Sequence, residues 1–147
     1  MILRPGVLAG VRVAAAGEVA ARMVELGAEP ADDELDVLVF DGAAVPGMPA
    51  VLDEAWDAIR GALRDDQLIV LIAPPPGDAH AEAARAGLEN MARTLSIEWA
   101  RRGIRPVAIT PGATTSPAEI AELVAFLASP AGAYYSGCRF DLGAADA

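Results

Sequence analysis

Residues 35–72 decide the fold: they read LDVLVFDGAAVPGMPAVLDEAWDAIRGALRDDQLIVLI. The runs LDVLVF at 35–40 and LIVLI at 68–72 have the near-continuous hydrophobicity of strands that are buried on both faces of a parallel sheet. Between them, residues 51–63 carry apolar side chains at helical spacing. A strand, a helix and a second strand in this order predict a parallel crossover unit.

The same alternation continues on both sides of this unit. The pattern predicts strands at 11–15, 104–109 and 137–142, and helices at 18–26, 78–102 and 116–127, with a surface loop over 29–34. We therefore expect an α/β fold, a Rossmann-like three-layer sandwich with a reduced parallel sheet of about five strands, as one domain over residues 1–147. The strands should lie side by side in sequence order, which makes 11–15 an edge strand whose Arg12 discourages further pairing.

Composition excludes several classes of function. The net charge of −10 and the pI of about 4.4 argue against a nucleic-acid partner, because the chain would repel phosphate. No apolar stretch approaches the roughly 20 residues that a membrane-spanning helix needs. Arg12 interrupts the first apolar run, which favours a cytoplasmic protein over an exported one.

The inventory of reactive side chains is small. All 11 basic residues are arginines, so chemistry that needs a lysine, such as a Schiff base or a phosphate-binding loop lysine, is excluded. His80 is the one histidine and Cys138 the one cysteine, which is too few soft ligands for a structural zinc site. We therefore predict no metal site.

Several segments, in order, resemble the short-chain dehydrogenase/reductase family in its ketoacyl-reductase-like branch. They are DVLV at 36–39, LIVLI at 68–72, AGLENMARTL at 86–95, EWA at 98–100 with GIR at 103–105, TPG at 110–112, PAEIAELVAFLAS at 117–129, and the stretches YSG at 135–137 and DLG at 141–143. The resemblance implies a Rossmann fold, a nicotinamide cofactor and a Ser, Tyr and Lys catalytic set. It covers the C-terminal two-thirds of the chain.

The chain departs from the family at each catalytic position. Counting back from AGL at 86–88, the family's lysine position is Arg85 and its tyrosine position is Ala81. The strand that should end in serine ends near Ala73 instead. An alanine cannot transfer a proton, and an arginine stays charged at all ordinary pH values. We therefore expect no catalytic residues.

The cofactor positions are also altered. The turn after the first predicted strand holds one glycine, and Glu18 follows it where the resemblance would place a phosphate. The family's second and third strands have no counterpart in the 29–34 loop. We predict no cofactor, with NAD or NADP as the alternative; the vestigial candidates for contacting it are Gly17, Asp41, Gly42, Pro111 and Gly112.

Two polar clusters have alternative interpretations. Asp78, His80, Glu82 and Arg85 form either an acid–base site or the solvated, capped first turn of a helix, and we favour the helix start. Residues 114–116 (TTS) either contact a phosphate or cap the last helix, and we favour the cap.

The family's catalytic residues are missing, whereas large apolar residues remain on the two long helices. This combination favours a non-catalytic protein that serves as an assembly or regulatory subunit. The partner is either a second copy or a full-length relative, because the resemblance implies that the helices at 51–63 and 78–102 build the main subunit interface. Candidate interface residues are Trp56, Leu88, Met91, Leu95 and Trp99. The alternatives are an NAD(P)-dependent oxidoreductase of ketoreductase type that uses non-standard residues, and a small-ligand or acyl-binding module.

Overall fold

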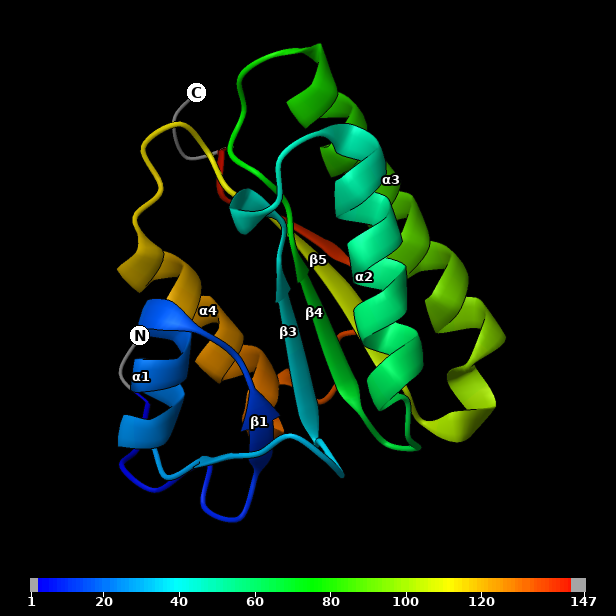
Figure 1. The fold of residues 1–147 in the computed structure, drawn as a ribbon. Coiled ribbons are helices and arrows are strands. Elements are labelled where there is room, and N and C mark those ends of the chain that lie inside the picture. The colour runs from blue at the N-terminus through cyan, green and yellow to red at the C-terminus, as the bar shows by residue number, and fades with distance from the viewer. Residues whose placement is uncertain (1–2, 144–147) are drawn as a thin grey trace.

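The computed structural model describes residues 3–143, and in this part of the chain six parallel strands form one sheet between two layers of helices (Figure 1). The strands are β1 (Arg12–Ala14), β2 (Glu29–Pro30), β3 (Val37–Asp41), β4 (Leu68–Ile72), β5 (Arg105–Thr110) and β6 (Arg139–Asp141). The helices are α1 (Gly17–Glu25), α2 (Met48–Ala62), α3 (Ala79–Glu98) and α4 (Pro117–Ala128), with short 3-10 turns at Gly42–Ala44, Ala100–Arg102 and Pro130–Gly132. The fold class predicted from the sequence is confirmed.

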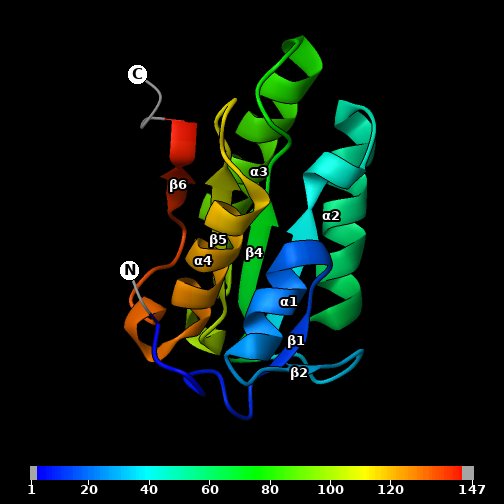
Figure 2. The same ribbon diagram turned by 90° about the vertical axis from the view of Figure 1, so that its left-hand side faces the viewer.

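The sheet separates two hydrophobic cores. Helices α1 and α4 cover one face, and Figure 2 shows them in front of the sheet; α2 and α3 cover the other. Along β4 all five side chains are buried: Leu68, Val70 and Ile72 pack in the α1/α4 core, and Ile69 and Leu71 pack in the α2/α3 core. This alternation explains why the strand reads as an unbroken apolar run.

The helix starts follow the capping signals in the sequence. Asp78 accepts a hydrogen bond from the backbone N–H of Ala81 at 2.9 Å, and this bond lowers the pKa of the Asp78 carboxyl. Ser116 and Glu119 form a reciprocal capping box at the start of α4. The long helix is shorter than predicted, since α3 ends at Glu98 and residues 100–102 form a separate 3-10 turn.

The predicted edge of the sheet is wrong, and so is the count of five strands. β2 lies outside β1 and pairs with it in parallel: the Glu29 N–H donates to the Val11 carbonyl at 2.7 Å, and the Ala31 N–H donates to the Val13 carbonyl at 2.9 Å. A strand of two exposed residues has no side-chain pattern to read, so the sequence showed only a polar loop. Arg12 does not blunt the edge; its guanidinium binds the Asp33 carboxylate at 2.7 Å and holds this loop against β1.

The other five strands keep their predicted order, β1-β3-β4-β5-β6. Their parallel registers bring the carboxyl ends of β1, β3, β4 and β5 to the same edge of the sheet. No helix in residues 3–143 has the length and apolarity that crossing a bilayer requires.

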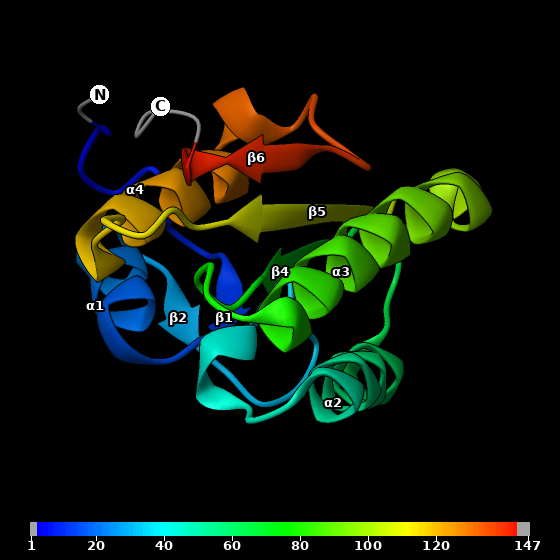
Figure 3. The same ribbon diagram turned by 90° about the horizontal axis from the view of Figure 1, so that it is seen from above.

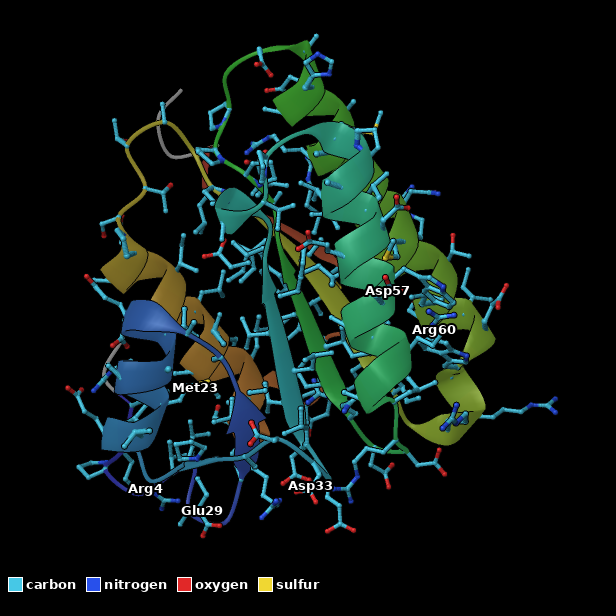
Figure 4. All side chains as sticks on the ribbon, viewed as in Figure 1. Arg4, Met23, Glu29, Asp33, Asp57 and Arg60 are labelled. Carbon is cyan, nitrogen blue, oxygen red and sulfur yellow. The ribbon has the colours of Figure 1, made fainter. Side chains whose placement is uncertain are left out.

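A pair of neighbouring residues in α1 tests the layer assignment. Met23 points toward the sheet and is fully buried, whereas the adjacent Val24 is 46% exposed (Figure 4). We expect Met23→Ala to lower the free energy of unfolding by about 2–5 kcal/mol, because it leaves a cavity in the α1/α4 core. Val24→Ala should change it by less than about 0.5 kcal/mol. Urea unfolding followed by circular dichroism measures both, and equal losses would contradict the packing of α1.

Candidate functional site

A cavity of about 660 Å³ lies at the carboxyl edge of the sheet, the end of the molecule that faces the viewer in Figure 3. The segments that follow four strands line it: Ala16 to Val19 after β1, Asp41 and Ala43 after β3, Ala73 and Pro75 after β4, and residues 111–113 after β5. In parallel α/β sheets ligands bind in the crevice outside the carboxyl ends of the strands. Of the five vestigial cofactor candidates, Gly17, Asp41, Pro111 and Gly112 line this one cavity.

The turn between β1 and α1 presents a carboxylate where an anion would otherwise be held. Ala16 occupies the N-cap position of α1 and supplies no side-chain hydrogen bond, so the first-turn N–H groups keep their partial positive charge. Glu18 lies in that first turn and lines the cavity. Its negative charge opposes a phosphate group at the position where helix N-termini commonly bind one.

The turn after β3 adds a second carboxylate. Asp41 Oδ1 accepts a hydrogen bond from the Ala43 N–H at 2.9 Å, which fixes the Asp41 side chain at the start of the 3-10 turn. Gly42, the fifth candidate, does not line the cavity but is buried beneath it. A Cβ atom there would lie 2.8 Å from the Ile72 carbonyl oxygen, so close packing of β3 against β4 requires glycine.

The turn after β5 is closed by its own hydrogen bonds. The Gly112 N–H donates to Thr115 Oγ1 at 2.8 Å, and the Thr115 hydroxyl lies in the wall of the cavity. Ser116 is part of the capping box of α4, as the capping interpretation of residues 114–116 requires. The sequence could not distinguish Thr115 from Thr114 and Ser116, because any of three consecutive hydroxyl residues could cap the helix or contact a ligand.

Arg85, at the family's lysine position, acts as a clamp on the backbone. Its Nη1 donates to the Pro74 carbonyl at 3.0 Å and to the Pro111 carbonyl at 2.7 Å, which joins the segments after β4 and β5. The side chain is only 14% exposed, and its Nε lies 3.8 Å from a Glu82 carboxylate oxygen. Charged donors to backbone carbonyls form strong hydrogen bonds, so this guanidinium has a structural role. Sequence reasoning found Arg85 but not its partners, which are backbone atoms 11 and 26 residues away.

The two other positions that the resemblance singles out, Ala73 and Ala81, carry no acid or base. Ala73 is completely buried, and its N–H donates to the Ile109 carbonyl at 2.9 Å. Ala81 lines a smaller cavity of about 270 Å³ together with Asp78 and His80. Asp78 is occupied as the helix cap, so the structure supports the helix-start interpretation of the cluster at 78–85. Within residues 3–143 no group of three His, Cys, Asp or Glu side chains is placed to hold a metal ion.

A second surface of interest is the outer side of α2 and α3, which lie side by side (Figure 1). A Cβ atom at Gly87 would lie 2.8 Å from Leu52 Cδ2, so the end of the Leu52 side chain of α2 packs directly against the backbone of α3. The rings of Trp56 and Trp99 stack between the helices, with centroids 6.3 Å apart and planes at 16°. Trp56 is 40% exposed and Ile97 is 74% exposed, so each of the two helices presents one large apolar side chain to solvent.

Two of the five predicted interface residues belong to the core instead. Leu88 and Leu95 are buried in the α2/α3 core, so they cannot present surface to a partner. Trp56, Met91 and Trp99 keep exposed or half-buried side chains. Helical spacing showed which apolar residues lie on the same face of the helix. It does not show whether that face packs on the protein's own sheet or on a partner, because both produce the same spacing.

The clamp can be tested by its effect on stability. Arg85→Met removes a guanidinium bound to two backbone carbonyls and should lower the free energy of unfolding by about 1–3 kcal/mol. Arg60→Met is the matched control, because Arg60 is 69% exposed and pairs with Asp57 on the outer side of α2 (Figure 4). The control should change stability by less than about 1 kcal/mol. Equal effects in chemical denaturation would show that Arg85 does not act as a clamp.

Comparisons with known proteins agree with this architecture. No protein-family model matches the chain. A 61-residue stretch is 34% identical to the glucose 1-dehydrogenase of Gluconobacter oxydans and covers 42% of this chain and 23% of that enzyme. A dehydrogenase/reductase from Sinorhizobium meliloti 1021 superposes with a TM-score of 0.63 at 24% identity, over 77% of this chain and 64% of the other. The angucycline C-6 ketoreductase LanV, solved with bound NADP, gives a TM-score of 0.70 at 16% identity, over 95% and 97% of the two chains.

The match thus spans less than two thirds of the length of the glucose dehydrogenase and of the Sinorhizobium protein. At identities of 24% and 16%, the two solved structures show a shared overall fold. The parallel α/β fold and a 61-residue stretch of sequence similarity are thus what this chain has in common with these dehydrogenases and reductases.

Proposed function

We propose that this chain is a non-catalytic relative of the short-chain dehydrogenases/reductases that serves as an assembly or regulatory subunit. The observation that carries this proposal is the pair of hydrogen bonds that the Arg85 side chain donates. The residue that the resemblance places at the family's lysine position is bound to two backbone carbonyls, and the tyrosine position, four residues earlier on the same helix, is Ala81. The site therefore has a structural cross-link in place of a proton relay.

The altered cofactor region supports the same proposal. β2 has two residues, so the sheet provides little surface beyond β1 on which the adenosine half of a dinucleotide would rest. The carboxylates of Glu18 and Asp41 line the cavity where the negatively charged pyrophosphate would have to enter. Repulsion between each of these carboxylates and the pyrophosphate makes the free energy of dinucleotide binding less favourable.

A second candidate function is an NAD(P)-dependent oxidoreductase, and the retained cavity at the carboxyl edge favours it. LanV was solved with NADP, and its name assigns it ketoreductase activity. On this chain the same reaction would need another residue to protonate the carbonyl oxygen. Thr115 is the one hydroxyl residue that lines the described cavity, and its Oγ1 already accepts a hydrogen bond from Gly112.

The apolar outer surface of α2 and α3 supports the assembly role. We use the term outer helix face for the exposed surface of these two helices, which includes Trp56 on α2 and Ile97 on α3. A packed partner would remove both side chains from water and gain roughly 25 cal/mol for each Å² of apolar surface that it covers. The partner is a second copy of this chain or a full-length relative, and the experiments below separate the two.

Cofactor binding discriminates between the two candidate functions. We expect titration with NADH and NADPH, followed by cofactor fluorescence and by calorimetry, to show no binding tighter than about 100 μM, or roughly −5.5 kcal/mol. LanV provides a positive control for NADPH. A dissociation constant below this limit would contradict the non-catalytic proposal and favour the oxidoreductase.

Assembly is tested by a charge on the outer helix face. Sedimentation should show an oligomer of the chain alone or a complex with a co-expressed full-length relative. Ile97→Glu should dissociate it, because it places a charge in an apolar contact. Val24→Glu is the matched control, since Val24 is also exposed but lies on α1, across the sheet.

The two partners give different outcomes. Concentration-dependent self-association that Ile97→Glu abolishes identifies a second copy as the partner. A complex that forms only with the relative identifies a mixed assembly. A chain that stays monomeric at high concentration and captures no relative would contradict the proposal.

A further inference from the structure

We propose that the cavity at the carboxyl edge of the sheet is a binding site for a small apolar amine that carries a positive charge. This inference goes beyond the assembly role and does not depend on it. It rests on the size of the cavity, on the chemistry of its walls and on the sign of the charges that they carry.

The size and the walls suit a small organic ligand. A volume of about 660 Å³ falls in the range of roughly 300–1,000 Å³ that is typical of small-molecule sites. Most of the wall is apolar, with Val19, Ile72 and Ile120 contributing branched aliphatic side chains and Pro75 and Pro117 contributing rings. Such walls favour a ligand with an apolar ring over one that is polar throughout.

The charges select among such ligands. Glu18 lies in the first turn of α1, which follows β1, and Asp41 is the last residue of the neighbouring strand β3. Both residues are exposed and line the cavity. No basic residue lines the cavity within the described part of the chain. Arg85, the nearest candidate by topology, donates to the Pro74 and Pro111 carbonyls instead. The formal charge of the lining is therefore negative.

Three positive features work in the other direction: the uncapped N-terminus of α1, the N-terminus of α4 and the guanidinium of Arg85. Ser116 and Glu119 cap the N-terminus of α4, and a Glu82 carboxylate oxygen lies 3.8 Å from Arg85 Nε, which reduces the effect of the last two. A helix N-terminus is equivalent to roughly half a positive charge, while the two carboxylates contribute about two negative charges. The first-turn N–H groups thus remain available to an acceptor on the ligand, but they do not reverse the sign of the site. A cation is favoured, a neutral molecule is tolerated and an anion is disfavoured.

Three probes with the same ring test the sign of the charge directly. Tryptamine is cationic, 3-ethylindole is neutral and indole-3-propionate is anionic at neutral pH. Protein-observed NMR titration of the full chain gives each dissociation constant and locates binding through the amide resonances of Gly17 and Gly112. We expect tryptamine to bind at least about tenfold more tightly than indole-3-propionate, with 3-ethylindole between them.

Isosteric variants link the preference to the two carboxylates. Glu18→Gln and Asp41→Asn should each reduce the ratio between the cationic and anionic probes, and together bring it to about one. Asn keeps the oxygen that accepts from the Ala43 N–H, so the turn should be preserved. Asp53→Asn removes a carboxylate from the exposed surface of α2 and should leave the ratio unchanged. Circular dichroism confirms that each variant is folded.

Three results would overturn the proposal: no binding of any probe, an anionic probe that binds as tightly as the cationic one, or chemical shift changes that exclude the residues of the cavity. A preference for the cation that survives in the Glu18 and Asp41 variants would also overturn it. NADPH titration of the same sample reports separately on the non-catalytic proposal, so the failure of one inference is distinguishable from the failure of the other.

Discussion

Burial of β4 on both of its faces is the constraint on which the rest of the structure depends. Each of its side chains from Leu68 to Ile72 is buried, and successive side chains enter opposite cores. Such a strand is stable only where helices cover both faces of the sheet, because water on either face would contact aliphatic side chains. Pairing with β3 on one side and β5 on the other then satisfies its backbone groups. The two helix layers, the parallel pairing and the shared carboxyl edge all follow from this arrangement.

The carboxyl edge of the sheet carries both the Arg85 clamp and the cavity. In this chain the Arg85 guanidinium binds the backbone of two strand ends, so a position that the family resemblance assigns to a catalytic lysine contributes to stability. Lysine has one charged nitrogen, whereas the guanidinium fork can donate several hydrogen bonds in fixed directions. An arginine at this position can therefore join two backbone segments with fixed geometry, which a lysine could not do in the same way. The cavity beside it remains open and carries negative charge.

The proposed assembly role and the proposed amine site use opposite parts of the molecule. The outer helix face lies on the far side of α2 and α3 from the sheet, and the cavity lies at the sheet's carboxyl edge between the turns. Neither surface needs the other in order to work. Similarity in fold to dehydrogenases and ketoreductases does not assign a reaction to this chain, because function depends on the residues at the site.

The sequence by itself determined the fold class, the order of five strands and the starts of the capped helices. Those features depend on local pattern: apolar runs for buried strands, helical spacing, and side chains such as Asp78 and Ser116 that cap the next turn. It also identified which side chains are missing, since the absence of lysine is a property of composition. The fold brings four of the five vestigial cofactor candidates to one cavity, because parallel strands place their carboxyl ends together.

Only the tertiary structure decided the rest. The pairing of β2 with β1 depends on backbone hydrogen bonds between residues that share no side-chain pattern. The partners of Arg85 are carbonyl groups, which every residue possesses, so no sequence signal marks them. The orientation of α3 about its own axis determines which of its side chains face the sheet. It buries Leu88 and Leu95 and leaves Ile97 exposed. Contacts between segments that are distant in sequence form only when the whole chain packs. A local sequence pattern shows that a side chain prefers to be buried, but not which segment it packs against.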